Sequence, residues 1–292
     1  MKLTKNYHLY ALIAIAFWSV AYILTRVTLH HFSPMSLGFL RYFIATIVLL
    51  TIAVAFKIKP PRKRDIPLFA ISGTFGFFLN MIAFNIGTSR ITASQSSVII
   101  ATTTAITAIL ARIFLKEKIQ IHQKLAIFIE FIGIIIVTET YKSINLNIGS
   151  LWVLTAAVSL SIYNLLQRKL TVHYSPLKTT MYSIFAGTIL LSIFAHQAFY
   201  EVKEAPTVQL VYIIILGVVS SALAYVVWTK ALSLAKEVTS VSNYMFLTPL
   251  FTTILGFFLI KENPPNSTLV GGIIILGGII IYNFGGKSKS KP

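Results

Sequence analysis

The sequence predicts an all-α polytopic membrane protein of ten transmembrane helices, arranged as two inverted five-helix repeats. Three observations lead to this fold class: long apolar segments, an uneven distribution of basic residues between alternate loops, and an internal repeat. Of the 292 residues, 56% are hydrophobic and 11% are charged, and so few charges cannot cover a soluble domain of this size. The chain has no cysteine, which excludes disulfides, thiol catalysis and cysteine-bound metals.

The apolar residues run in segments of about 18 or more, the length that spans a bilayer core. Because hydrocarbon offers no hydrogen-bond partners, each segment is expected to be a helix. The first half contains Leu9–Leu29, Met35–Phe56, Ile66–Ile86, Ser94–Leu115 and Leu125–Thr138. The second half contains Leu151–Gln167, Leu177–Phe199, Val208–Ala231, Val238–Ile260 and Leu269–Tyr282. Pro34, Pro67 and Pro176 fall at segment starts, where a missing N–H costs nothing.

The basic residues predict the orientation. With the N-terminus inside, the inner segments carry Lys2, Lys5, Lys57, Lys59, Arg62, Lys63, Arg64, Lys116, Lys118, Lys124, Arg168, Lys169, Lys178, Lys230, Lys236, Lys287, Lys289 and Lys291. The outer loops hold little beyond Arg90, Lys142, Lys203 and Lys261. This asymmetry predicts a multi-pass protein of the inner (plasma) membrane with both termini in the cytoplasm. The net charge of +17 lies in short clusters between apolar segments, which favours the lipid bilayer over nucleic acid as the partner.

The sequence aligns with itself. At an offset of 142 residues Ser19 meets Ser161, Arg26 meets Arg168, residues 31–34 meet 173–176, and Thr46 meets Thr188. At an offset of 145 Ser97 meets Ser242, Thr107 meets Thr252, residues 116–117 meet 261–262, and Gly133 meets Gly278. An ordered set of matches at one slowly drifting offset indicates a repeat. We therefore expect repeats at 1–145 and 146–286 and a basic cytoplasmic tail at 287–292.

Each repeat has five segments, an odd number, so the second enters the membrane from the opposite side. Inverted repeats of this kind are typical of secondary transporters, in which two similar halves open one central site alternately to each side. Channels and membrane enzymes also contain repeats, so the pattern favours a transporter without excluding them.

Several motifs resemble the EamA-type branch of the drug/metabolite transporter superfamily. They are Phe17-Trp18-Ser19, then Ser33-Pro34 and Arg41, then Tyr163-Asn164 with Arg168-Lys169, and Thr248-Pro249-Leu250-Phe251 followed by Glu262. The first half departs from this pattern at Thr104, which stands where the second half has Pro249. The resemblance covers the whole chain. It implies ten helices around a central cavity, with the fifth and tenth helices at the periphery.

A transporter site is expected near the midplane, lined by polar and aromatic groups from both halves. The candidate substrate-binding residues are Trp18, Ser19, Tyr22, Asn80, Phe84, Gln95, Ser161, Tyr163, Asn164, Tyr225, Trp228, Asn243 and Tyr244. An amide orients a carboxylate or amine, and a ring supplies an apolar wall or a cation–π face. The alternative for each residue is interfacial anchoring or helix–helix hydrogen bonding.

Two charged residues inside segments need an explanation. Arg41 could bind a substrate carboxylate, but the resemblance implies a position near the outer mouth, which favours snorkelling to the interface or bonding to helix-end carbonyls. Glu130 is the one carboxylate clearly inside a segment, and it could exchange protons for substrate. Small multidrug relatives carry their essential glutamate in the first span, which here has none, and the fifth span is expected to be peripheral. Both roles for Glu130, coupling and structural, stay open.

The remaining motifs predict structure rather than chemistry. Glu117 and Glu262 beside Lys116 and Lys261 are expected to fix symmetric turns. Gly271 and Gly278 share a face that suits close packing, within a monomer or in a homodimer. We find no HExxH, P-loop or GxSxG motif, so no enzymatic activity, metal or cofactor is expected.

The leading hypothesis is a secondary transporter, an exporter of small metabolites such as amino acids that works by alternating access. Within the class, the alternative is a proton-coupled multidrug or cation efflux carrier. Outside the class, the alternatives are a polytopic membrane enzyme or a non-transporting subunit. The sequence does not identify the transported solute, the direction of transport or its energy source.

Overall fold

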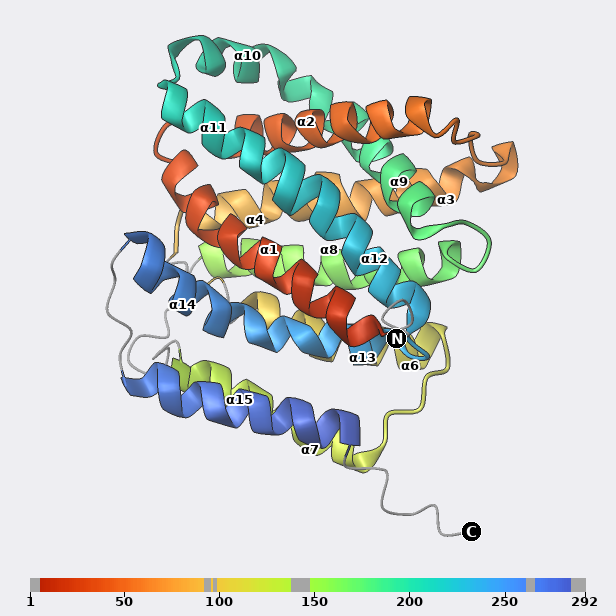
Figure 1. Ribbon diagram of the computed structural model, residues 1–292, viewed down its shortest axis with the longest axis vertical. Coiled ribbons are helices and arrows are strands. Elements are labelled where there is room, and N and C mark those ends of the chain that lie inside the picture. The colour runs from red at the N-terminus through yellow and green to blue at the C-terminus, as the bar shows by residue number, and fades with distance from the viewer. Residues whose placement is uncertain (1–5, 92–95, 97–98, 138–147, 261–265, 285–292) are drawn as a thin grey trace.

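A computed structural model describes residues 6–91, 96, 99–137, 148–260 and 266–284, and these ranges are helical with no strand (Figure 1). The first half contains α1 (Tyr7–Thr28), α2 (Pro34–Ala55), η2 (Lys63–Asp65), α3 (Ile66–Gly73), η3 (Thr74–Leu79), α4 (Asn80–Thr88), α6 (Thr103–Phe114) and α7 (Ile121–Val137). The second half contains α8 (Ile148–Leu170), α9 (Pro176–Leu191), η5 (Ser192–Phe194), α10 (Ala195–Glu204), α11 (Thr207–Ile215), η6 (Leu216–Leu223), α12 (Ala224–Leu234), α13 (Val238–Ser242), η7 (Asn243–Phe246), α14 (Leu247–Ile260) and α15 (Asn266–Phe284).

Within these ranges, six continuous helices are long and apolar enough to cross a membrane: Tyr7–Thr28, Pro34–Ala55, Lys63–Thr88, Ile148–Leu170, Pro176–Glu204 and Thr207–Leu234. Four expected segments correspond to shorter apolar helices. In one of them, Val238–Ile260, the 3₁₀ turn η7 separates α13 from α14. Large apolar side chains point outward, and Val54, Ile189 and Ile273 are each more than 70% exposed. Such a surface suits lipid and not water, so the chain is an integral membrane protein.

Local structure recurs at the 142-residue offset. Ser33 and Ser175 cap α2 and α9 by accepting a hydrogen bond from the backbone three residues on, each at 3.3 Å. A proline follows each cap at the first helical position, as expected. The π-helical segments η3 and η6 begin at residues 74 and 216, which are also 142 apart. The Oγ1 atoms of the equivalent residues Thr46 and Thr188 are 2.9 Å apart.

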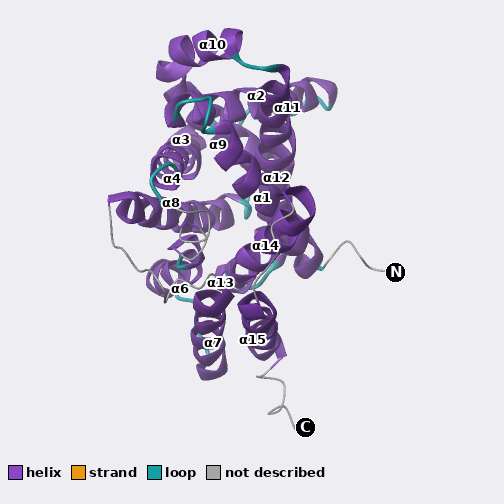
Figure 2. Ribbon diagram, turned by 90° about the vertical axis from the view of Figure 1, so that its left-hand side faces the viewer, coloured by secondary structure: helices purple, strands orange, loops and turns teal. Residues whose placement is uncertain are grey.

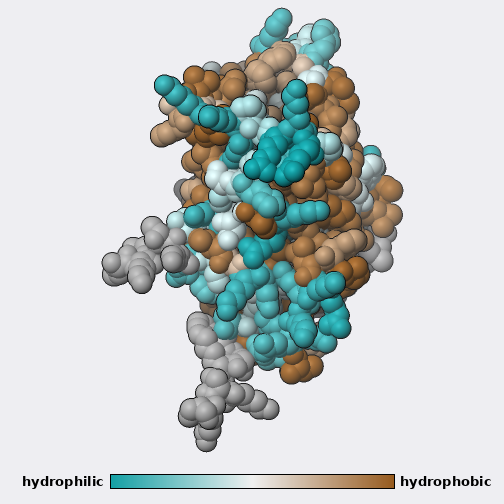
Figure 3. Space-filling view, turned by 90° about the vertical axis from the view of Figure 1, so that its right-hand side faces the viewer, coloured by the Kyte–Doolittle hydropathy of each residue, from teal (hydrophilic) through white to brown (hydrophobic). Residues whose placement is uncertain are grey.

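The two ends of the described chain lie at one end of the molecule, where the Tyr7 hydroxyl donates to Asn283 Oδ1 at 3.3 Å. Figure 3 views the molecule from the right-hand side of Figure 1, where both ends of the described chain lie. Hydrophilic side chains gather in the middle of this face, and hydrophobic ones flank them. Arg168 donates from Nη1 to the carbonyl of Leu232 at 2.9 Å. It thereby satisfies a carbonyl that the end of α12 leaves free.

Helices α7 and α15 pack side by side at the edge of the molecule (Figure 2). Glycine allows this contact: a Cβ at Gly133 would lie 2.9 Å from the carbonyl oxygen of Gly271 and 2.7 Å from Ile275 Cγ1. Gly278 likewise faces Glu130 on α7. The glycine face that we considered for homodimerisation therefore contacts α7 of the same chain.

The substitution Gly133→Ala should destabilise the protein by about 1–3 kcal/mol, because the added methyl group overpacks the α7–α15 contact. Thermal unfolding of the purified protein in detergent measures the effect as a lower melting temperature. Gly277→Ala is the matched control, since a Cβ at Gly277 meets nothing within 4 Å. Equal destabilisation by both substitutions would contradict this account of the glycines.

Candidate functional site

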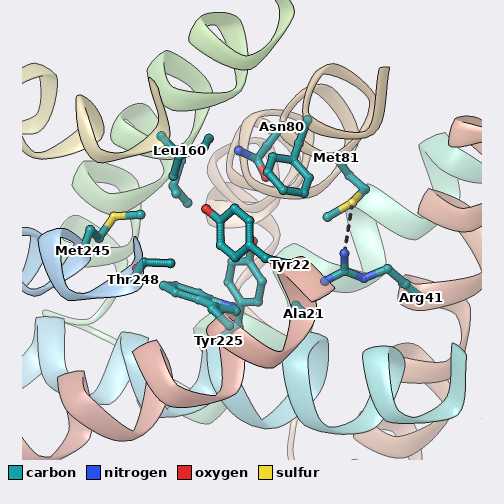
Figure 4. A pocket seen from close by; sticks show the side chains of 12 residues that line it. Ala21, Tyr22, Arg41, Asn80, Met81, Leu160, Tyr225, Met245 and Thr248 are labelled. Carbon is teal, nitrogen blue, oxygen red and sulfur yellow. Dashed lines mark hydrogen bonds between the residues drawn. The ribbon is translucent and has the colours of Figure 1, made fainter. Parts of the chain in front are cut away.

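A small cavity of about 60 Å³ lies in the middle of the helices, with side chains from both halves of the chain pointing into it (Figure 4). The lining residues are Trp18, Ala21, Tyr22, Arg41, Asn80, Met81, Phe84, Ile100, Leu160, Tyr225, Met245 and Thr248. A volume of this size holds a few water molecules, at roughly 10–15 Å³ of such space for each. Sites for small molecules measure about 300–1,000 Å³, so the cavity in this conformation is too small to hold such a molecule.

Aromatic rings form one wall of the cavity and hold one another in place. Trp18 and Tyr225 meet at 5.0 Å between ring centroids, and Tyr22 and Phe84 at 5.4 Å, both pairs edge to face. Tyr225 also packs against Phe77 at 4.9 Å. Trp18 Nε1 donates to the carbonyl oxygen of Ser220 at 3.1 Å. Ser220 lies in the π-helical segment η6, and the wider turn there leaves carbonyls free to accept from neighbours.

Arg41 supplies the positive charge of the cavity. Its guanidinium donates from Nε to Ser221 Oγ and from Nη1 to Thr25 Oγ1, each at 3.3 Å, and lies 3.7 Å from Met81 Sδ. The residue is 3% exposed, so the expectation that it snorkels to the interface was wrong. The reason is that hydroxyl groups on α1 and η6 offer it neutral partners inside the protein.

No carboxylate neutralises Arg41 within the part of the chain that the structure describes, where the one ion pair joins Arg64 and Asp65. A buried charge without a counter-charge is costly in a membrane protein. The cavity is therefore suited to an anionic group. It is unsuited to a cation, which the guanidinium would repel.

Five of the thirteen candidates line the cavity: Trp18, Tyr22, Asn80, Phe84 and Tyr225. The Asn80 amide is anchored, because Nδ2 donates to the carbonyl oxygen of Ala156 on α8 at 2.9 Å. Its oxygen is the part that remains for a ligand. Gln95 lies outside the described residues.

Four other candidates, Ser161, Tyr163, Asn164 and Trp228, make buried hydrogen bonds to other helices next to the cavity. Trp228 Nε1 donates to Asn164 Oδ1 at 2.9 Å, and Asn164 Nδ2 donates to Ser242 Oγ at 3.4 Å. Ser161 Oγ donates to the carbonyl oxygen of Thr103 at 3.2 Å, and the Tyr163 hydroxyl lies 3.5 Å from Thr229 Oγ1. These groups join helices to one another and do not border the cavity.

Gln167 brings two further elements, α3 and α9, into these contacts. Gln167 Nε2 donates to Ser72 Oγ on α3 at 2.9 Å and to Ser183 Oγ on α9 at 3.0 Å. Its Oε1 accepts from Thr229 Oγ1 on α12 at 3.4 Å. We call the set Asn164, Gln167, Trp228, Thr229 and Ser242 the polar network.

The last three candidates lie away from the cavity. Ser19 Oγ donates to the carbonyl oxygen of Ile15 in its own helix at 2.8 Å. The Tyr244 hydroxyl bonds to His8 Nδ1. Asn243 Nδ2 donates to Glu130 Oε1 at 2.9 Å.

The lining residues that the sequence did not single out are mostly apolar: Ala21, Met81, Ile100, Leu160, Met245 and Thr248. Apolar residues are common in every helix of this chain, so composition gives no signal for them. The repeat does give one for Leu160, which lies 142 residues after Trp18. Repeat-equivalent positions of the two halves thus meet at one cavity.

Comparison with known proteins bears on the fold and on the family. The solved structure of a protein 14% identical superposes with a TM-score of 0.78, covering 96% of this chain and 99% of that one, which shows a shared fold. A "Probable terminal-alkyne amino-acid exporter" of Streptantibioticus cattleyicolor is 26% identical over 97% of this chain and 95% of its own length. An "S-adenosylmethionine uptake transporter" of Rickettsia bellii is 28% identical over 87% and 85%.

An "Uncharacterized transporter YdfC" of Bacillus subtilis is 27% identical over 91% of this chain and 87% of its own. The sequence model of the EamA-like transporter family matches twice, over residues 5–139 and 147–284. The two matches together span nearly all of the chain. The resemblance carried by the sequence motifs is confirmed: this chain belongs to the EamA-like transporter family.

Proposed function

We propose that this protein is a secondary transporter that exports small carboxylate-bearing metabolites, such as amino acids, by alternating access. The observation that carries the proposal is the buried Arg41, which faces an aromatic cavity without a counter-charge in the described residues. The guanidinium would bind the carboxylate of a zwitterion. The rings of Trp18, Tyr22 and Phe84 would receive an apolar side chain.

The proposed architecture is ten helices in two inverted repeats around this cavity, with repeats at 1–145 and 146–286. The two family matches, the paired caps of α2 and α9 and the paired π-helical segments support it. The basic loops support an inner-membrane protein with both termini in the cytoplasm. The contact between Tyr7 and Asn283 is consistent with the termini sharing a side.

In this topology the cavity lies nearer the outer face. A second hollow, of about 410 Å³, is lined by Arg26, His30 and Arg90 among others, at the outer ends of α1 and α4. The two share no lining residue, but Arg41 at the cavity bonds to Thr25, which precedes Arg26 of the outer hollow on α1. The positive groups around it favour the approach and departure of an anionic solute.

The polar network would close the path between the cavity and the cytoplasm. Leu160 borders the cavity on α8, and Asn164 and Gln167 follow one and two turns nearer the cytoplasmic end of the same helix. Hydrogen bonds from these two side chains reach α3, α9, α12 and α13. Opening to the cytoplasm would break these bonds, and opening outward would leave them intact.

Export is the direction that we propose, on the strength of the relative named as an amino-acid exporter. The relative named for S-adenosylmethionine uptake works in the other direction, so the family fold serves both. Cation efflux is disfavoured because the charged side chain at the cavity is a guanidinium. Neither a membrane enzyme nor a non-transporting subunit has a specific observation in its favour.

Replacing Arg41 tests the proposed carboxylate contact. Arg41→Gln should lower the apparent affinity for the transported solute about 10- to 100-fold, because a hydrogen bond to a charged group contributes roughly 1.5–3 kcal/mol. Counterflow of radiolabelled amino acids in liposomes containing the purified protein measures this affinity. Arg112→Gln, the same change at an exposed arginine on α6, is the matched control and should leave counterflow unchanged.

Wild-type liposomes that exchange none of the amino acids would contradict the proposed cargo. Equal counterflow by wild type and Arg41→Gln would contradict the role of Arg41 while leaving a transporter in place.

The polar network should stabilise the inward-closed state. Asn164→Ala removes the acceptor of the buried Trp228 N–H, which costs about 1–3 kcal/mol and should lower the melting temperature of the purified protein. In a Trp228→Phe background the donor is already absent, so the same substitution should cost clearly less. An equal loss of stability in both backgrounds would mean that the hydrogen bond contributes nothing.

A further inference from the structure

Glu130 is completely buried on α7, and the surrounding structure is shaped to hold it. Asn243 Nδ2 donates to Glu130 Oε1 at 2.9 Å. On the opposite helix Gly278 leaves room for the side chain, since a Cβ at that position would overlap Glu130 Cγ. The carboxyl group is therefore clamped between α15 and the first residue of η7.

The hydrogen bond between Glu130 and Asn243 leaves two acceptors unused. Glu130 Oε2 and Asn243 Oδ1 are both buried and have no hydrogen-bond partner among the described residues. A buried acceptor without a donor costs about 1–3 kcal/mol, and a charged one more. Turning the amide over cannot help, because an ionised carboxylate only accepts.

Among the residues that the structure describes, the neighbouring groups do not supply a compensating positive charge. On the elements packed against α7, the titratable side chains are Tyr282 of α15 and Tyr244 of η7, while α14 has none. Tyr282 is close enough to interact electrostatically with Glu130, and also with Glu117 and Glu237. All three of these are acids. On α7 itself, His122 and Lys124 lie in the first turns, about two turns from Glu130.

Glu117 and Glu237 already have partners at the ends of the helices. Glu117 Oε1 accepts from the backbone of Val238 at 2.7 Å, which caps α13. Glu237 Oε2 accepts from Gln123 Nε2 at 3.3 Å. Glu130 thus differs from both in being fully buried and half satisfied.

One proton on Glu130 would satisfy both unused acceptors. Asn243 Nδ2 already donates to Oε1, and a protonated Oε2 would donate to Asn243 Oδ1, so that the acid and the amide would form a closed pair of two hydrogen bonds. The group is then neutral, so no buried charge remains. From this geometry we infer that Glu130 and Asn243 form a proton-binding site, which is loaded in this conformation and couples transport to protons.

The segment that carries Asn243 connects this site to the rest of the proposed mechanism. Ser242, the preceding residue, accepts from Asn164 at its hydroxyl and from Thr104 Oγ1 at its carbonyl, the latter at 2.8 Å. Met245 and Thr248, just after it, line the cavity. Loss of the proton would leave an ionised carboxylate that the side-chain oxygen of Asn243 repels. The segment 242–248 would have to move so that water can hydrate the charge.

Proton release would therefore favour the state in which the inner hydrogen bonds of Ser242 are broken. In this step the covalent O–H bond of Glu130 breaks and the proton passes to water. No other covalent bond changes. This coupling rests on the proposed transport function, whereas protonation of Glu130 in the resting protein does not.

The experiment compares wild type with Glu130→Gln and with Glu204→Gln, the same change at an exposed carboxylate on α10. The glutamine side chain in the Glu130→Gln variant is not charged and offers an N–H to Asn243 Oδ1, so this variant copies the protonated pair and should fold. Infrared spectra of the purified proteins at neutral pH should show the carbonyl band of a protonated carboxylic acid in wild type and in Glu204→Gln. Glu130→Gln should lack that band, and a wild-type protein without it would overturn the inference.

The coupling is measured in liposomes with a pH-sensitive dye inside and an amino acid that wild type exchanges. Wild type and Glu204→Gln should move protons when a solute gradient drives net transport. Glu130→Gln should keep counterflow but lose this proton movement. Proton movement by Glu130→Gln at the wild-type rate would overturn the coupling. Net solute transport by wild type down a solute gradient without proton movement would overturn the coupling and leave the transport proposal standing. An absence of counterflow in wild type counts against the transport proposal instead, and the infrared spectra still decide whether Glu130 holds a proton.

Discussion

The structure depends on one constraint: a polar group inside the hydrocarbon region must find its partner within the protein. The polar network meets this constraint with side-chain bonds that cross from helix to helix, such as Trp228 to Asn164 at 2.9 Å. The indole of Trp18 meets it with a carbonyl that a π-helical turn leaves free. Arg41 and Glu130 meet it only in part. A solute carboxylate can supply the counter-charge that Arg41 lacks, and a proton can satisfy the second oxygen of Glu130.

These two residues have opposite deficits. Arg41 has hydroxyl and sulfur neighbours but, within the described ranges, no negative charge to balance its own. Glu130 has a donor for one oxygen and none for the other. The segment 242–248 is near both, because Asn243 bonds to Glu130 while Met245 and Thr248 border the cavity that Arg41 lines. A solute carboxylate at Arg41 and a proton at Glu130 would thus act on one common element.

The outline of the fold was predictable because it rests on features that a sequence displays directly. Pro34 and Pro176 mark helix starts, and the 142-residue offset pairs caps and π-helical segments of the two halves. The side chains that face the cavity were harder to predict. A helix in lipid is apolar on its outer face as well as its inner one, so periodicity no longer shows which face is inside. The sequence therefore could not distinguish Asn80, which lies in the cavity wall, from Asn164, which lies in the polar network.

Charged residues were misjudged for a related reason. Arg41 was expected at the interface because a long side chain near a helix end can reach water, but Ser221 and Thr25 hold it inside. Those two residues lie 180 and 16 positions away, and no local pattern links them to it. Asn243, which we predicted as a ligand for a solute, bonds to Glu130. Contacts between distant segments decide these roles, and a single sequence does not contain them.

The central claim is that the guanidinium of Arg41 recognises a carboxylate in an otherwise apolar cavity. The most direct measurement is competition for binding to the purified protein among three forms of one transported amino acid: the free acid, its methyl ester and the amine that lacks the carboxyl group. The account predicts that the free acid competes and that the ester and the amine compete at least tenfold less well, by about 1.4 kcal/mol or more. Equal competition by all three would contradict it.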